Sequence, residues 1–256
     1  MGVSFSSLSL IEAAAQSVGR RSSFWAMGSQ LCGFKAKKAN KWLARKGYPA
    51  LNAGWDHGLG PLVMALGFND YIDVDINEKA KVYLDLTGSI PSTIAGSADF
   101  VLDTGTLEHV FDIYKGICGM NQLLSLGGVI LHVSPVTWFE HGYVNFNSRF
   151  FNEFYKANDY SLVFESFQIY LNNPFYIPGY TPFLPKRFGD FNLPLSKGSK
   201  SSVNNVFRKL GKIFRLPRKL CYACAWKKED ARMVFQVPQD IGSRFDLVKQ
   251  ILTVGD

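Results

Sequence analysis

The sequence has few cysteines and no long apolar run. Its four cysteines, Cys32, Cys118, Cys221 and Cys224, are too scattered for a disulfide framework. No stretch is long and apolar enough to cross a bilayer, and the first residues lack the basic segment and long apolar core of a signal peptide. These absences favour a cytoplasmic protein.

Clustered metal ligands are also lacking. Residues 220–226 are typical of a strand, and strand alternation places Cys221 and Cys224 on opposite faces. No second cysteine pair is present to complete a zinc site. We therefore expect no metal, although the sequence does not exclude a site assembled from distant acids.

Apolar residues are plentiful and charge is unevenly placed. Hydrophobic residues make up 47% of the 256 residues, which is enough for the core of one α/β domain. Up to Pro185 there are 13 basic and 15 acidic residues, whereas Lys186 to Asp256 holds 15 basic and 6 acidic ones. An anionic partner is therefore expected at the C-terminal third.

Residues 98–135 have a strand–helix–strand pattern. Apolar runs at 100–102 and 129–133 flank apolar residues at helical spacing: Val110, Ile113, Ile117, Met120, Leu123 and Leu124. A crossover of this length makes the two strands parallel, and parallel sheets bind ligands at the carboxyl ends of their strands. Asp103 to His109 lies at one such end, and Ser134-Pro135 lies at the other.

The motif Asp103-Thr-Gly-Thr-Leu-Glu-His-Val, followed by Leu-Gly-Gly128 and an apolar strand, resembles class I S-adenosylmethionine-dependent methyltransferases. The loop Glu140-His-Gly-Tyr143 is similar to that of the small methyltransferases that accompany glycan-biosynthesis enzymes. The resemblance covers roughly residues 20–170. It implies S-adenosyl-L-methionine as the cofactor. The implied fold is α/β, a Rossmann-like, mostly parallel sheet of seven strands with helices on both faces. Its last strand is antiparallel, and an insertion separates strands six and seven.

On this basis we expect a single methyltransferase-like domain over 1–256. It comprises an N-terminal helix within 1–20, a cofactor-binding core at 21–170, an insertion or lid at 171–218, and a final strand and tail at 219–256. Apolar and basic residues alternate at helical spacing over 203–216. Such a helix either contacts an anionic membrane peripherally or packs on its own domain.

Further elements follow from local patterns. A capping box from Ser9 to Glu12 predicts a helix through Ala15. Strands are predicted at 24–27, 71–76, 81–86 and 160–170, and helices at 61–68 and, capped by Ser148, at 148–158.

The first strand ends at Met27 and continues into Gly28-Ser29, where the resemblance implies a glycine-rich turn. The usual Gly-x-Gly-x-Gly is reduced here to Gly28, with Gly33 further on. We expect Met27, Gly28 and Ser29 to contact the cofactor, with the backbone of this turn and the start of a following helix receiving its carboxylate. An ordinary strand-to-helix turn has the same sequence.

Acids end the next two strands. Asp75 is predicted to accept hydrogen bonds from two ribose hydroxyls, with Asp73 as the alternative on the same side of the strand. The resemblance assigns Asp85 to the adenine edge. A solvated aspartate at a strand end is the structural alternative for Asp85.

After the fourth strand, the resemblance places Asp103, Thr104, Gly105 and Thr106 beside the methionine half of the cofactor. Glu108 is interpreted as a cap that the helix dipole favours.

His109 and His141 are the catalytic candidates. An imidazole at His141 could take a proton from an acceptor hydroxyl, since imidazole titrates near neutrality. A structural role for His141 is equally compatible with the sequence.

These observations favour methyl transfer from S-adenosyl-L-methionine to a hydroxyl of a sugar or another small molecule, by direct displacement. One alternative is a catalytically inactive methyltransferase-like binding module, which the reduced glycine turn would permit. A less favoured one is an NAD(P)-dependent oxidoreductase, which the missing Gly-x-Gly-x-x-Gly opposes. Nucleic acid is an unlikely partner because no RNA-binding module is evident.

Overall fold

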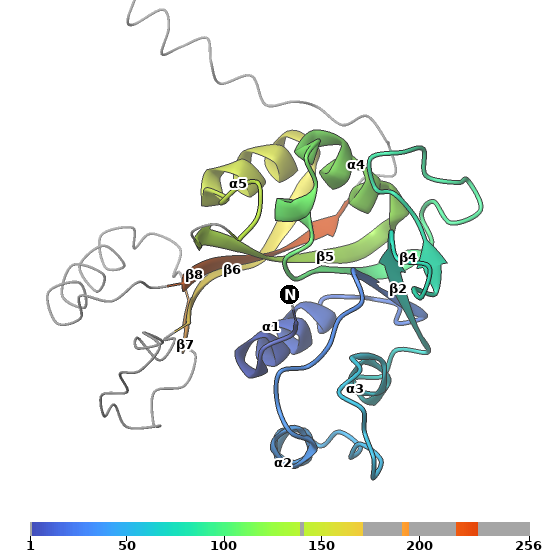
Figure 1. The fold of residues 1–256 in the computed structure, drawn as a ribbon, viewed down its shortest axis with the longest axis vertical. Coiled ribbons are helices and arrows are strands. Elements are labelled where there is room, and N and C mark those ends of the chain that lie inside the picture. The colour runs from blue at the N-terminus through green and yellow to red at the C-terminus, as the bar shows by residue number, and fades with distance from the viewer. Residues whose placement is uncertain (1, 139–140, 171–190, 195–218, 230–256) are drawn as a thin grey trace, which may run out of the picture.

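The computed structural model describes residues 2–138, 141–170, 191–194 and 219–229. Within these residues the strands form one sheet of eight, in the order β3-β2-β1-β4-β5-β8-β6-β7 (Figure 1). The strands are β1 (Ser23–Met27), β2 (Asp70–Asp75), β3 (Val82–Tyr83), β4 (Ala98–Asp103), β5 (Leu124–Thr137), β6 (Tyr160–Tyr170), β7 (Phe191–Pro194) and β8 (Lys219–Lys228). The helices are α1 (Phe5–Ala15), α2 (Ala36–Lys46), α3 (Gly60–Ala65), α4 (Ile113–Leu123), α5 (Ser148–Ala157) and the 3-10 helix η1 (Leu107–His109).

The Rossmann-like sheet is confirmed. The strands from β3 through β5 pair in parallel, and β8 lies antiparallel between β5 and β6. The short edge strand β7, antiparallel to β6, comes from the expected insertion and makes the sheet larger than predicted by one strand. The rest of the insertion, including the basic segment 203–216, and the tail after residue 229 lie outside the described residues.

Helices cover both faces of the sheet, with α4 and α5 on one side and α1, α2 and α3 on the other (Figure 1). Strand alternation divides the core accordingly, since successive side chains point to opposite faces. In β1, Phe24 packs with the α1–α3 layer, whereas Trp25 packs with the α4–α5 layer. Cys221 and Cys224 fall on opposite faces, as the sequence predicts.

Two helix starts differ from the predictions. Helix α1 begins at Phe5 because the hydroxyl of Ser4 accepts a hydrogen bond from Ser7 N at 3.1 Å, so the expected capping box at Ser9 lies inside the helix. Helix α5 is capped by Asn147, whose side chain accepts from Arg149 N.

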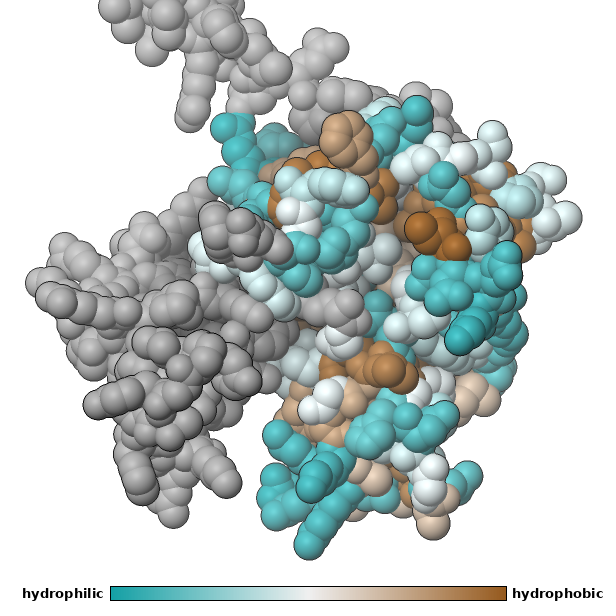
Figure 2. All heavy atoms as spheres, in the orientation of Figure 1, coloured by the Kyte–Doolittle hydropathy of each residue, from teal (hydrophilic) through white to brown (hydrophobic). Residues whose placement is uncertain are grey.

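Two further observations concern the helices among the described residues. The outer side of α2 is hydrophilic (Figure 2), and of that helix only Ala39 and Leu43 are buried. Among the described residues, no helix is both long and apolar enough to cross a membrane.

Candidate functional site at the carboxyl edge of the sheet

The strand register brings three chain segments to one edge of the sheet. Met27, at the end of β1, pairs with Val74 on one side and with Asp103 on the other. The turn after β1, the acid that ends β2 and the loop after β4 therefore lie together at the carboxyl edge, where parallel sheets bind ligands.

Gly28 occupies the centre of this edge. Its φ of 75° is left-handed, a conformation that glycine adopts without steric cost. A Cβ at this position would lie 3.1 Å from Thr106 Oγ1, 3.3 Å from Gln30 Nε2 and 3.9 Å from Asp75 Oδ2. The missing side chain thus leaves a small cradle between a hydroxyl, an amide and a carboxylate.

Both acids of β2 contact the turn. Asp75 Oδ2 accepts from Ser29 N at 3.1 Å, and its Oδ1 accepts from Asn77 N at 3.2 Å. Asp73 Oδ2 accepts from the hydroxyl of Ser29 at 2.9 Å, and its Oδ1 accepts from Lys81 N. Asp75 also reaches the cradle at Gly28, which favours Asp75 over Asp73 as a ligand-binding acid.

The turn does not run directly into a helix, so the expected helix start beside Gly28 is wrong. Helix α2 begins at Ala36, and the intervening loop bridges Val3 through Cys32 and Gly58 through Leu31. The backbone hydrogen bonds of this loop go to those neighbours.

Gln30, which belongs to the predicted cofactor turn, has a buried side chain that closes the interior side of the turn. It is 5% exposed, its Nε2 donates to Met27 O at 2.7 Å, and its Oε1 accepts from Thr104 Oγ1 at 2.9 Å. The Thr104 side chain therefore faces the interior, toward Gln30. The hydroxyl of Thr106 donates to the same carbonyl, Met27 O, at 2.8 Å.

Asp85 follows the short edge strand β3. Its Oδ1 accepts from the backbone N and the hydroxyl of Thr87, and these two hydrogen bonds lower the pKa of Asp85. The side chain is exposed and shapes its own turn.

Asp103 is buried and supports the loop that follows it. Its Oδ1 accepts from Thr106 N at 2.9 Å and from Leu107 N at 3.3 Å, while its Oδ2 contacts His132 Nδ1 at 2.8 Å. His132 Nε2 in turn contacts the hydroxyl of Tyr155 at 2.6 Å. At 0% exposure, Asp103 positions Gly105 and Thr106 through this network.

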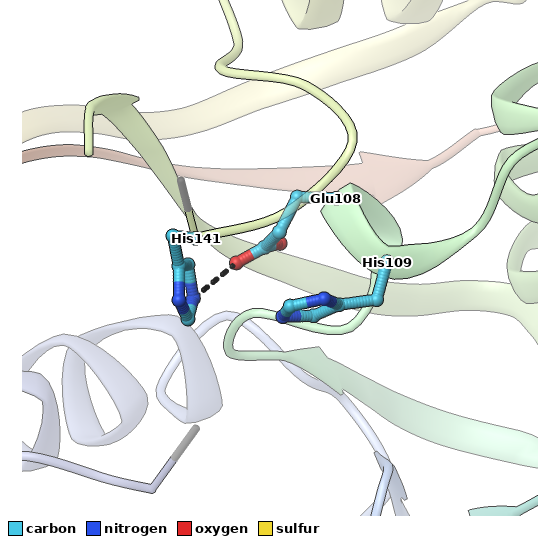
Figure 3. A group of neighbouring side chains, drawn as sticks. All are labelled: Glu108, His109 and His141. Atoms are coloured by element: carbon cyan, nitrogen blue, oxygen red, sulfur yellow. Dashed lines mark ion pairs between the residues drawn. The ribbon is translucent and has the colours of Figure 1, made fainter. Parts of the chain in front are cut away.

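Glu108, His109 and His141 form a second cluster beside Thr106 (Figure 3). The first two lie in η1 and the third in the loop after β5. One possible ligand atom from each lies within 4.8 Å of the other two. Glu108 Oε1 is 3.5 Å from His141 Nε2, and the two imidazole rings are 4.9 Å apart in an edge-to-face arrangement.

Burial sets the protonation of this cluster. Helix α4 is capped by Asp112, and neither oxygen of the 0% exposed Glu108 accepts a hydrogen bond from the described residues, so the interpretation of Glu108 as a helix cap is wrong. Burial, with the nearby charge of Asp103, raises the pKa of Glu108 to about 8. His109 is exposed as a residue, but partial desolvation of its ring lowers its pKa, which favours a neutral imidazole near pH 7.

The structure therefore brings some of the sequence-predicted site residues together. Gly28, Ser29, Asp75 and Thr106 meet at one cradle, and His109 and His141 meet beside it. Asp103 and Thr104 are buried and support these loops through hydrogen bonds. The roles of all these residues stay predictions.

Among the comparisons with known proteins, only the comparison with solved structures found matches. No protein-family model matches the chain, and no curated protein matches it. The YcgJ protein of Bacillus subtilis is 11% identical with a TM-score of 0.48, and the match covers 88% of this chain and 99% of that one. A SAM-dependent methyltransferase of Archaeoglobus fulgidus is 12% identical with a TM-score of 0.43, over 86% and 94% of the chains. Phosphoethanolamine N-methyltransferase 2 of Haemonchus contortus, in complex with S-adenosyl-L-methionine, is 10% identical with a TM-score of 0.43, over 88% and 53%. Likenesses this distant leave the activity open.

Proposed function

We propose that this protein is an S-adenosyl-L-methionine-dependent methyltransferase that methylates a hydroxyl of a sugar or another small molecule. The observation that carries the proposal is the cradle at Gly28, bordered by Asp75 and Thr106 at the carboxyl edge of the sheet. A Cβ would fill this cradle, so the residues present fit a ligand that needs close approach to backbone.

Within the proposal, each side of the cradle has a role. The Asp75 carboxylate would accept hydrogen bonds from ribose hydroxyls, and the backbone of Gly28 and Ser29 would contact the methionine end. Asp85 would lie at the adenine edge. Thr106 and the Gly105 backbone, held by Asp103, would border the sulfur. When bound, the cofactor supplies a methyl group on a positively charged sulfur.

The chain's own task is then alignment and proton removal. The acceptor hydroxyl must lie in line with the methyl carbon and away from water. His141 lies beside the cradle and would take the hydroxyl proton. His109 and the buried Glu108, which both contact His141, would fix the orientation of its ring. Apart from β7, the insertion lies outside the described residues, as does the segment 203–216, for which a peripheral membrane contact is one expectation.

Calorimetric titration of the full chain with S-adenosyl-L-methionine and, separately, with NAD tests the proposal. We expect binding of the methyl donor and none of NAD. Asp75→Asn should lower affinity at least about tenfold, because a charged hydrogen bond contributes roughly 1.5–3 kcal/mol. Asp70→Asn, at the opposite end of the same strand, is the control and should bind as wild type. NAD binding alone would favour the oxidoreductase, and unchanged affinity in Asp75→Asn would refute the ribose assignment.

A further inference from the structure

We propose that Glu108, His109 and His141 bind one divalent transition-metal ion beside the cofactor cradle. Their side chains converge from two segments that follow adjacent strands of the sheet (Figure 3). The proposal goes beyond methyl transfer, and metal binding here does not depend on that activity.

The geometry is close to that of a metal site. Ligand atoms about 2.1 Å from a tetrahedral ion lie about 3.4 Å from one another. Glu108 Oε1 and His141 Nε2 are already 3.5 Å apart. His109 is exposed, so its ring has room to close the remaining distance, which is at most 4.8 Å between ligand atoms.

Glu108 supplies an independent observation. The side chain is 0% exposed, and neither carboxylate oxygen has a hydrogen-bond partner among the described residues. Burial of a carboxylate without hydrogen bonds costs free energy, and such groups in folded proteins are normally paired or coordinate a metal. A cation between Glu108 and the two histidines would satisfy this carboxylate.

The surroundings hold the ligands in place. Trp138 stacks on the ring of His141, with centroids 3.6 Å apart and planes 11° from parallel. Tyr143 N donates to the backbone carbonyl of Glu108 at 2.8 Å. Gly142 permits this approach, because a Cβ there would lie 2.7 Å from the same carbonyl oxygen. The loop that carries His141 is thus pinned to the residue that carries the carboxylate.

The donor set indicates the kind of ion. Two imidazoles and one carboxylate suit Zn²⁺, Mn²⁺ or Fe²⁺, whereas Mg²⁺ and Ca²⁺ prefer oxygen ligands alone. Three protein ligands leave at least one coordination position open.

If the proposed function holds, an acceptor hydroxyl could occupy that open position and lose its proton more readily. Its oxygen would form the new bond to the methyl carbon as the carbon–sulfur bond breaks, and the proton would pass to solvent. His141 would then act as a ligand, and the ion would replace it in activating the hydroxyl.

Equilibrium dialysis of the full chain, stripped with a chelator and reloaded with Zn²⁺, Mn²⁺ or Mg²⁺, tests the site. We expect one equivalent of Zn²⁺ or Mn²⁺ and much weaker binding of Mg²⁺. Glu108→Gln and His141→Ala should each weaken binding at least about tenfold, because even loss of a group that only supports a metal ligand costs about 10–100-fold in affinity. His57→Asn is the control, because His57 is exposed, lies elsewhere, and has a φ of 68° that asparagine tolerates.

Substitution with Co²⁺ gives a second readout, since its visible absorption reports imidazole and carboxylate coordination directly. A folded Glu108→Gln variant with an unchanged Co²⁺ spectrum would overturn the site, as would a wild-type chain that retains no transition metal. If Glu108→Gln does not fold, His109→Ala at the exposed position decides. Titration with the methyl donor is a separate measurement, so either proposal can fail without the other.

Discussion

The buried network of Asp103, His132 and Tyr155 makes a sharp prediction about stability. A carboxylate only accepts hydrogen bonds, so His132 Nδ1 donates to Asp103. A neutral imidazole then accepts the Tyr155 hydroxyl proton at Nε2, and Asn121 Nδ2 donates to the same hydroxyl at 3.1 Å. Asp103 therefore decides which atom donates in both hydrogen bonds, the one between Asp103 and His132 and the one between His132 and Tyr155.

Asp103→Asn reverses the direction of both hydrogen bonds. In this variant, we take the new side-chain amide oxygen to accept the hydrogen bonds from Thr106 N and Leu107 N. The side-chain amide nitrogen then faces His132 and must donate to its Nδ1. His132 Nε2 then carries the proton, and the hydroxyl proton of Tyr155, which is 0% exposed, loses its acceptor. One unpaired buried group costs about 1–3 kcal/mol, and replacing charged by neutral hydrogen bonds costs about 1 kcal/mol more. We expect a loss of roughly 2–4 kcal/mol in the free energy of unfolding.

A double-mutant cycle with Tyr155→Phe isolates the effect. Tyr155→Phe leaves His132 Nε2 without its donor, and the double variant also leaves only one group unpaired. The two losses should therefore fall short of additivity by about 1–3 kcal/mol in urea unfolding. Asp159→Asn, exposed and at a φ of 58°, is the control and should change stability by less than about 0.5 kcal/mol. Additive losses would refute the proposed proton direction.

Two further predictions use matched pairs. Gly28→Ala and Gly47→Ala should both cost about 1–2 kcal/mol, since their φ values are 75° and 77°. Only Gly28→Ala should also weaken binding of the methyl donor in calorimetry, because nothing lies within 4 Å of a Cβ at Gly47; equal binding would place the ligand elsewhere. Asp99→Ala should lower the free energy of unfolding by about 2–4 kcal/mol, because the 2% exposed carboxylate holds Ser22 N, Ser23 N and the Arg20 guanidinium. Asp70→Ala, whose ion pair with Lys81 is half-exposed, should cost less than about 1 kcal/mol in the same chemical denaturation, and equal losses would contradict the role of Asp99.

Much of the fold follows from local patterns in the sequence. A compact apolar run placed the strand at 24–27, alternation with a period of two placed those at 71–76 and 160–170, and helical spacing placed α4 between two parallel strands. The sequence alone could then place the carboxyl ends of these strands at one edge of the sheet, because a crossover connection makes the two strands parallel. The strand register confirms that the turn at Gly28, the acid Asp75 and the loop around Thr104 follow neighbouring strand ends, and their roles stay predictions.

Local patterns carry no information on which side chains meet across that edge. Gln30 reaches Thr104 over 74 residues, and this contact depends on the loop that delays α2 until Ala36. The sequence indicated a helix cap at Glu108, yet the fold buries this side chain against a loop that comes after the next strand.

The sequence by itself determined the order of most elements and which strand ends share one edge of the sheet. Only the tertiary structure decided which residues on that edge are exposed, which are supports, and that Glu108 faces two histidines. The physical reason is range: backbone periodicity is set by neighbours along the chain, whereas burial and side-chain contact are set by strand register and loop path.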